Sequence, residues 1–295
     1  MMPLTPPSQS FTFNAADGTP LAGALFEPTS QPRSAVLIAG ALGVNQTFYA
    51  AFASWLAKRG HLVMTFDLRG MGASRQPQYR DSLRGLDVDM LGWARLDFAA
   101  AVKHLVALNG GAQIAVIGHS LGMHHAAMTD AATQGCISKV LSVAAGAGYW
   151  RDWVPRARKS APLMLHVAGP LFTPLFGYFP GKRLGMVGDL PAPVMRQWSS
   201  WCKHPDFAWG HEPAKVLPSL QSARFAITAL SFSDDDAISL VCTQKLLAVL
   251  PNAPSQLRVV SSSDVGLEKI GHLGAFRRAG EAALWPMLQE AITAI

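Results

Sequence analysis

The chain has 295 residues, of which 49% are hydrophobic, so it can form one large α/β domain or two smaller ones, and a disordered protein is excluded. Its formal net charge is +6, but the basic residues are scattered, and the densest group is RDWVPRARK at residues 151–159. We interpret this group as a solvated face, with a nucleic-acid or membrane-binding patch as the alternative. No stacked-aromatic or basic-helix signature accompanies it, so no nucleic-acid partner is expected.

Cysteine usage and the length of the apolar runs indicate the compartment. Cys136, Cys202 and Cys242 are far apart and in no metal-ligand spacing, so we expect reduced thiols, no metal site and no cofactor. Residues 1–13 lack the basic and apolar regions of a secretory leader, and no run of about 18 apolar residues occurs. These features predict a soluble, cytoplasmic protein without a membrane span.

The predicted strands begin with a hairpin. Its two strands are residues 9–13 and 21–26, joined at Asp17-Gly18, a dipeptide that suits the positive φ angles of a hairpin turn. Later apolar runs lack strict alternation, as expected for strands covered on both faces. These runs are residues 35–39, 62–66, 114–118, 140–144 and 226–232.

Helical spacing alternates with these runs. It predicts helices at residues 48–59, ending at Gly60, and at residues 93–108 and 284–295. Alternating strands and helices predict a mostly parallel sheet with helices on both faces, and such sheets place their chemistry at the carboxyl ends of the strands.

This alternation stops at residues 146–219, which are rich in Pro and Gly and contain five of the eight tryptophans. The segment is too long for an ordinary connection and too aromatic for a flexible linker. We therefore predict an inserted cap or lid at 146–219 on a core made of residues 1–145 and 220–295. Its aromatic residues form a small core of the cap, line an apolar substrate pocket, or do both. Trp198 and Trp201 are the candidates for the pocket.

A serine nucleophile is predicted within GHSLG, residues 118–122. The motif follows a predicted strand and precedes a helix of about ten residues, which is the context of a nucleophile elbow. A sharp reversal there would lift the Ser120 hydroxyl above the sheet at the positive end of a helix dipole. We expect the neighbouring His119, His124 and His125 to be packing or pocket-wall residues rather than metal ligands.

A serine hydroxyl needs a base, and the base needs an orienting acid. His272 is the candidate base because the glycines of KIGHLGAF place it in a loop that can reach across the top of the sheet. The acid should follow the strand at 226–232, where SFSDDD leaves Asp235 and Asp236 as alternatives, depending on the length of the turn.

An oxyanion hole would need two backbone N–H groups. One should come from Leu121, and the other from Ala41 or Leu42 in the loop AGALGVNQ that follows the strand at 35–39.

Together these motifs resemble the α/β hydrolase superfamily. GHSLG, the segment DLRGMGAS at 67–74, SFSDDD and GHLGAF occur in the order of that family and cover most of the chain. Residues 43–63, 177–185 and 196–207 further resemble a branch of predicted bacterial α/β hydrolases with a cap insertion. In that branch the second aspartate of the pair is catalytic, which favours Asp235. Ala39-Gly40 replaces the common His-Gly pair of the superfamily, so no histidine shapes the oxyanion loop.

The predicted chemistry is acyl transfer to water through an acyl-serine, on a small-molecule carboxyl ester or thioester with an apolar part. The alternatives are an acyltransferase or a carbon-carbon hydrolase with the same triad, and a non-catalytic binding protein on this scaffold. No exposed apolar stripe that would demand dimerisation is evident, so the oligomeric state is not predicted.

Overall fold

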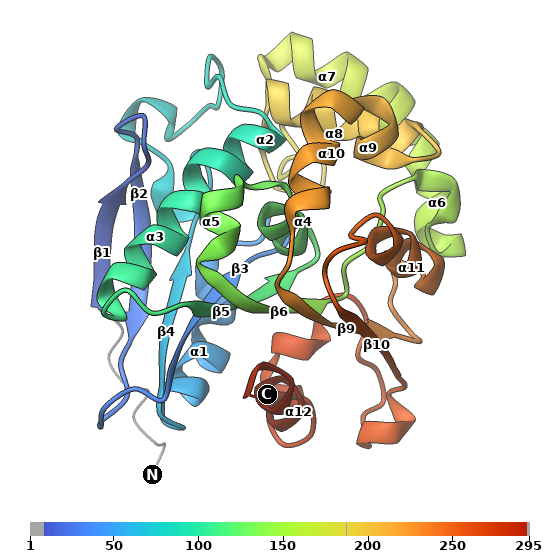
Figure 1. Ribbon diagram of the computed structural model, residues 1–295. Helices are drawn as coiled ribbons and strands as arrows, with labels where there is room; N and C mark the ends of the chain where they lie inside the picture. Colours follow the sequence, from blue (N-terminus) through green and yellow to red (C-terminus); the bar gives the residue numbers. More distant parts are fainter. Residues whose placement is uncertain (1–8, 187, 294–295) are drawn as a thin grey trace.

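The computed structural model describes residues 9–186 and 188–293 (Figure 1). Its main sheet has eight strands in the order β1-β2-β4-β3-β5-β6-β9-β10. β1 and β2 pair antiparallel and β2 pairs antiparallel with β4, whereas all pairs from β4 to β10 are parallel. The strands are Gln9–Asn14 (β1), Pro20–Phe26 (β2), Ser34–Ala39 (β3), His61–Phe66 (β4), Ile114–His119 (β5), Ile137–Val143 (β6), Ala226–Phe232 (β9) and Ser255–Val260 (β10).

Helices cover both faces of this sheet, which explains the apolar runs without alternation. α1 and α12 lie on one face, and α3, α4, α5 and α10 lie on the other (Figure 1). Val36 and Ile38 of β3 pack in the core of the first face, whereas Leu37 packs in that of the second. The helices of the core are Ala50–Ala57 (α1), Met90–Gly92 (α2), Ala99–Leu108 (α3), Leu121–Met128 (α4), Ala131–Gly135 (α5), Leu240–Ala248 (α11) and Leu284–Thr293 (α12).

Three elements differ from the predictions made above. The helix expected at residues 93–108 is π-helical at Trp93–Phe98 and α-helical at Ala99–Leu108. The loop at Asp17-Gly18 has five residues, 15–19, and only Gly18 in it has a positive φ, +80°. β10 was not predicted because its sequence, SQLRVV, lacks the continuous apolar run of the other parallel strands, and in the structure it is a largely exposed edge strand.

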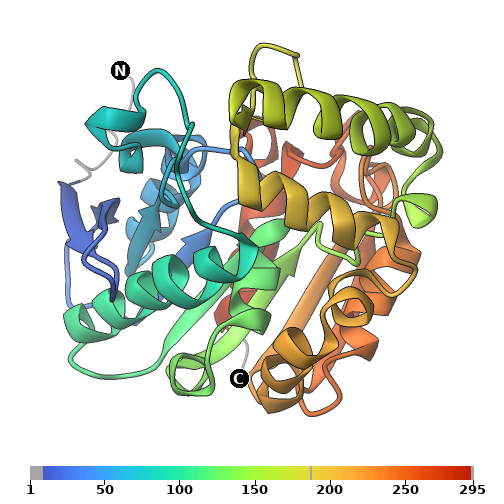
Figure 2. The same ribbon diagram turned by 90° about the horizontal axis from the view of Figure 1, so that it is seen from above.

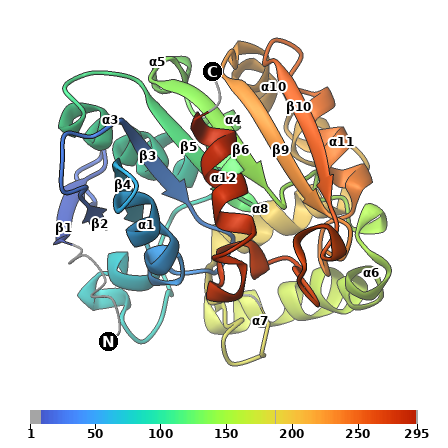
Figure 3. The ribbon, with the colours of Figure 1, turned by 90° about the horizontal axis from the view of Figure 1, so that it is seen from below.

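Residues between β6 and β9 form helices that lie where the parallel strands point. Figure 3 shows the strands running toward α6, α7 and α8, and α10 packs against α4. None of the helices in the described residues is long and apolar enough to cross a membrane. The elements here are Pro155–Pro162 (α6), a π-helical turn at Leu163–Ala168, Gly169–Phe176 (α7), the short strands Tyr178–Phe179 (β7) and Leu190–Pro191 (β8), Ala192–Lys203 (α8), Phe207–His211 (α9) and Pro213–Ser222 (α10).

Candidate active site

Ser120 lies in a sharp turn between β5 and α4. Its φ is +52° and its ψ is −112°, an arrangement that an L-residue rarely adopts. The two glycines of the motif explain why the chain can reverse so tightly. A Cβ at Gly118 would lie 2.6 Å from the Met123 nitrogen, and a Cβ at Gly122 would overlap the carbonyl oxygen of Ala39. The turn therefore presents the serine hydroxyl at the amino end of α4.

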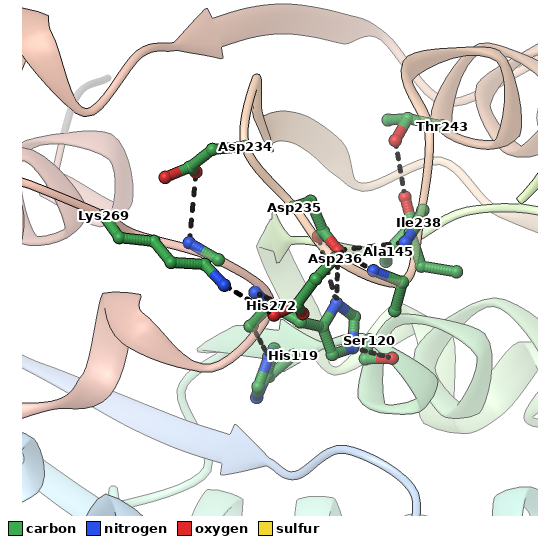
Figure 4. Close-up of polar contacts among 12 residues, drawn as sticks. His119, Ser120, Ala145, Asp234, Asp235, Asp236, Ile238, Thr243, Lys269 and His272 are labelled. Atoms are coloured by element: carbon green, nitrogen blue, oxygen red, sulfur yellow. Dashed lines mark hydrogen bonds and ion pairs between the residues drawn. The ribbon is translucent and has the colours of Figure 1, made fainter. Parts of the chain in front are cut away.

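His272 connects this serine to an aspartate (Figure 4). Its Nε2 lies 3.1 Å from the Ser120 Oγ, and its Nδ1 lies 3.1 and 3.0 Å from the two carboxylate oxygens of Asp235. Because an ionised carboxylate only accepts hydrogen bonds, Nδ1 carries the ring proton and Nε2 accepts from the serine hydroxyl. The Asp235 side chain is 2% exposed and the His272 side chain 16%. Sequence positions 120, 235 and 272 thus form one hydrogen-bonded array.

All three consecutive aspartates contact the loop of His272, each in a different way (Figure 4). Asp234 accepts the backbone N–H groups of Ile270 and Gly271 at 2.7 and 3.1 Å. Asp235 reaches the imidazole. Asp236 accepts from the Lys269 ammonium at 3.0 Å and from the His272 backbone N–H at 3.4 Å.

Asp235 and Asp236 also differ in their other hydrogen bonds. Asp235 also accepts the backbone N–H groups of Ala237 and Ile238 at 2.7 and 2.9 Å, so its carboxylate is held in place. Burial acts to raise the pKa of Asp236, but the hydrogen bonds from Lys269 and His272 outweigh it and lower that pKa.

The loop after β3 distinguishes the two candidate oxyanion donors. The Ala41 N–H donates to the Tyr49 hydroxyl at 2.9 Å. Within the described part of the chain, the N–H groups of Leu42 and Leu121 have no hydrogen-bond acceptor. Those two groups therefore remain available to a ligand beside Ser120.

A buried chain of hydrogen bonds runs from Ala41 to the loop of His272. The Tyr49 hydroxyl lies 2.8 Å from His119 Nδ1, and His119 Nε2 lies 2.9 Å from the carbonyl oxygen of His272. That carbonyl only accepts, so Nε2 carries the proton and Nδ1 accepts from the tyrosine. Burial lowers the pKa of His119 to about 3, with a further contribution from the nearby His272, so this ring stays neutral at ordinary pH.

A mainly apolar cavity of about 500 Å³ opens beside Ser120. Ala41, Leu42 and Leu121 line it together with Ser120 and His272, and the helical region between β6 and β9 contributes most of its other large side chains. Those side chains are Trp153, Met164, Met186, Trp198 and Phe207.

The structure separates the remaining predicted pocket residues. Trp198 lines the cavity, whereas His119 lies behind His272 and Trp201 does not reach it. Trp201 is fully buried, packs against Phe207 and donates its indole N–H to Glu212 at 2.7 Å. Of the two helix histidines, His124 lines the cavity and His125 is buried near Trp93 and Phe98. Among the described residues, no group of three or more His, Cys, Asp or Glu is arranged to hold a metal.

Sequence reasoning missed Tyr49, Trp153 and Asp234. Tyr49 contacts His119 across 70 positions of the chain, and no local motif signals such a contact. Trp153 is one of five tryptophans in the segment at 146–219, and nothing in the sequence distinguishes it from the others. Asp234 is the first aspartate of SFSDDD, and its contacts hold the backbone of the loop of His272.

Comparison with known proteins gives one family match. A family model described as serine aminopeptidase, S33, matches residues 30–181, just over half of the chain. Comparison with curated proteins gives no match.

Many solved structures share the fold. A soluble variant of the monoglyceride lipase of Saccharomyces cerevisiae has a TM-score of 0.65 at 15% identity, with 100% of this chain and 97% of that chain covered. An acylaminoacyl peptidase of Pyrococcus horikoshii has a TM-score of 0.61 at 12% identity, covering 100% and 43%. A carboxyl esterase of Bacillus coagulans has a TM-score of 0.58 at 16% identity, covering 86% and 90%. At these identities the likeness concerns the fold alone.

Proposed function

Because the chain belongs to the S33 serine aminopeptidase family of α/β hydrolases, we propose that it is a serine hydrolase that cleaves carboxyl esters or thioesters with an apolar part. One observation carries this proposal. His272 bridges Ser120 and Asp235 at hydrogen-bond distances, at the wall of an apolar cavity. A nucleophile, a base and an orienting acid in this order are what acyl transfer requires.

The reaction would proceed in two halves. His272 Nε2 takes the proton of Ser120 as the serine oxygen attacks the substrate carbonyl, and Asp235 stabilises the imidazolium that forms. The imidazolium then protonates the leaving alcohol or thiol, which departs and leaves an acyl-serine. In the second half, His272 removes a proton from water as the water oxygen attacks the acyl carbon. The imidazolium then gives that proton to the serine oxygen as its bond to the acyl carbon breaks, which releases the acid product and restores Ser120.

We assign the oxyanion hole to the N–H groups of Leu121 and Leu42. Both groups lack an acceptor among the described residues and both residues line the cavity next to Ser120. Ala41 is the weaker candidate because its N–H is already bound to Tyr49. Backbone donors of this kind contribute on the order of 10²- to 10³-fold to the rate.

The cavity favours an apolar acyl or alcohol group over a peptide with a free amino terminus. An aminopeptidase must hold the α-ammonium group of its substrate, and a carboxylate is the usual partner of such a cation. Asp236 is the one acidic side chain among the described residues that line the cavity, and it already binds Lys269 and the backbone of His272.

Hydrolysis of a series of p-nitrophenyl esters, from acetate to palmitate, tests the proposal with wild type and Ser120→Ala in parallel. We expect turnover by the wild type alone and a chain-length profile that reports the depth of the cavity. A fluorophosphonate probe should label wild type and leave Ser120→Ala unlabelled. Absence of labelling in the wild type would refute the nucleophile and favour a binding protein. Labelling without ester turnover would move the search to carbon-carbon bonds and to acyl transfer.

A further inference from the structure

One long helical rod at the edge of the molecule presents an unpaired apolar face. The rod consists of α6, the π-helical turn and α7, residues 155–176 (Figures 1 and 2). Its inner side is buried at Ala161, Leu165 and Ala168, and Met164 reaches the cavity beside Ser120. Its outer side carries four aliphatic residues that are 50–62% exposed, Leu163, Val167, Leu171 and Leu175.

These four residues form a continuous stripe. They recur every four positions. Because an α-helix completes one turn in 3.6 residues, side chains four positions apart would shift gradually around the axis of a regular α-helix. The π-helical turn at Leu163–Ala168 winds more slowly and offsets part of this drift. Four of the eight large hydrophobic side chains that are exposed in the described residues belong to this stripe, so they are not randomly scattered. An apolar face of this kind on a soluble domain marks an interaction site.

Basic side chains lie at both ends of the stripe. Residues 153–188 contain five lysines and arginines and neither aspartate nor glutamate. Arg156 and Lys159 are exposed on the first turns of the rod. At the other end, the exposed Arg84 donates to the carbonyl oxygen of Leu175 at 3.1 Å. The stripe is therefore bounded by basic groups at both ends.

We infer that this face docks on an anionic lipid surface. An exposed helical face with aliphatic residues and flanking Lys or Arg is the pattern of a helix that lies in the plane of a membrane interface, where apolar burial and attraction to anionic head groups add. The basic group at 151–159, interpreted above as a solvated face, then belongs to this surface. A second copy of the chain fits less well, because either orientation of two such rods brings basic ends together. Docking on this face would place the rod that lines the cavity against the lipid.

Vesicle co-sedimentation of the Ser120→Ala chain tests this inference without any hydrolysis of the lipid. The probes are phosphatidylcholine vesicles with and without phosphatidylglycerol. We expect binding that requires phosphatidylglycerol and weakens with salt. Leu171→Gln with Leu175→Gln should lower the partition coefficient about tenfold or more, as should Arg156→Gln with Lys159→Gln. Leu108→Gln is the matched control, since Leu108 is a 47% exposed leucine at the end of α3, and it should bind as the parent does.

Several outcomes overturn the inference. They are the absence of binding to either vesicle, an equal loss in Leu108→Gln, or a concentration-dependent dimer that the Leu171→Gln and Leu175→Gln pair abolishes. The lipid-docking proposal and the proposed hydrolase activity can be refuted independently of each other. In the chain with Ser120 intact, the stripe variants should hydrolyse p-nitrophenyl acetate at the parent rate. Lipid binding without ester turnover would leave the docking surface standing and remove the proposed function.

Discussion

Asp235 and Asp236 are adjacent in sequence but hold different parts of His272. Asp235 contacts the imidazole, whereas Asp236 contacts the backbone N–H of the same residue and the Lys269 ammonium. Only the first contact fixes which ring nitrogen carries the proton. The sequence leaves two aspartates as alternatives, and one side-chain contact, between Asp235 and the imidazole of His272, distinguishes them.

The first prediction follows from this difference. Asp235→Asn should lower kcat/KM for a p-nitrophenyl ester by about 10³-fold or more, because the amide N–H₂ can donate to Nδ1 and stabilise the wrong tautomer. Asp236→Asn is the matched control and should stay within about tenfold of wild type, since an exposed ion pair and a long hydrogen bond contribute little. If Asp236→Asn proves the more damaging change, the role of the orienting acid belongs to Asp236 instead.

The second prediction concerns Tyr49. Tyr49→Phe leaves the Ala41 N–H and His119 Nδ1 unpaired in a buried place, which should cost roughly 1–3 kcal/mol in the free energy of unfolding. It should also lower kcat more than it changes KM, because the chain of hydrogen bonds ends on the backbone of His272. Urea unfolding and steady-state kinetics measure both effects. Tyr79→Phe is the control, since that hydroxyl has no hydrogen bond among the described residues. Equal behaviour of the two variants would exclude a positioning role for Tyr49.

The nucleophile turn is the element that the sequence predicted best. The motif GHSLG predicts a sharp turn, because glycines on both sides of the serine allow a strand to reverse directly into a helix. In the structure that turn lies at Ser120, between β5 and α4. The α/β-hydrolase fold predicted from the motifs is confirmed. Local motifs predict local turns well, and the alternation of buried runs with helices predicts the sheet.

Gly122→Ala gives a third prediction at the scale of this element. The new Cβ would overlap the carbonyl oxygen of Ala39, so β3 and α4 must separate. We expect a loss of roughly 1–3 kcal/mol in the free energy of unfolding and a fall in activity. Gly135→Ala is the control, because nothing lies within 4 Å of its new Cβ and its φ is not positive. The two midpoints of urea unfolding report the difference, and a Gly122→Ala midpoint equal to that of Gly135→Ala would contradict the tight packing.

The segment between β6 and β9 was harder to predict. Its helices contain Pro162, Pro174 and Pro218, residues that normally end a helix, and part of it is π-helical. Its tryptophans carry the same sequence signal whether they face a cavity or a core. Packing between segments far apart in the chain decides which tryptophan faces the cavity and which is buried in the core.

Trp198 and Trp201 provide the fourth prediction. Trp198 lines the cavity, so Trp198→Ala should shift the preferred ester chain length toward longer acyl groups. Trp201 is buried away from the cavity, so Trp201→Ala should lower the free energy of unfolding by about 3–5 kcal/mol without a comparable shift in chain-length preference. The ester series and urea unfolding of both variants separate the two roles. A reversed pattern would place Trp201 rather than Trp198 in the substrate pocket.

At the scale of the whole molecule, the sequence does not show which apolar and titratable side chains the fold exposes and which it buries. The stripe at residues 163–175 has no signature in the sequence, because buried residues such as Leu165 and Ala168 separate its members and only exposure distinguishes the two sets. The burial of the two α4 histidines is equally hard to read from the sequence. His124 and His125 are adjacent to a serine motif, yet both are buried. Because burial lowers the pKa of both imidazoles, we expect these histidines to affect the pH dependence of the free energy of unfolding.

Three buried histidines should make the protein less stable in mild acid. Burial lowers the pKa of His119 to about 3, of His124 to about 4 and of His125 to about 3. Below about pH 6.5 the unfolded chain binds protons at these residues and the folded chain does not. Stability is therefore lost as pH falls, by about 1.4 kcal/mol per pH unit for each histidine, until the folded pKa values are reached.

Asp97 acts in the opposite direction. Burial raises its pKa to about 6 despite its ion pair with Arg69, so between about pH 6 and about pH 4 the folded chain holds a proton that the unfolded chain lacks. The three histidines outnumber this group, so these four residues together take up about two protons on unfolding in that window. Burial also lowers the pKa of His61 and of His104, which adds to the uptake in the same direction.

Urea unfolding between about pH 7 and about pH 5 measures the net effect, and the free energy of unfolding should fall with pH. His125→Leu should reduce this slope by about one proton, because it removes a titrating ring whose Nε2 has no hydrogen-bond partner among the described residues. The exposed His211 supplies the control variant, His211→Asn, which should keep the slope of the wild type. A free energy of unfolding that is independent of pH across this range, or an equal change of slope in both variants, would show that the buried rings are not the groups that couple stability to pH.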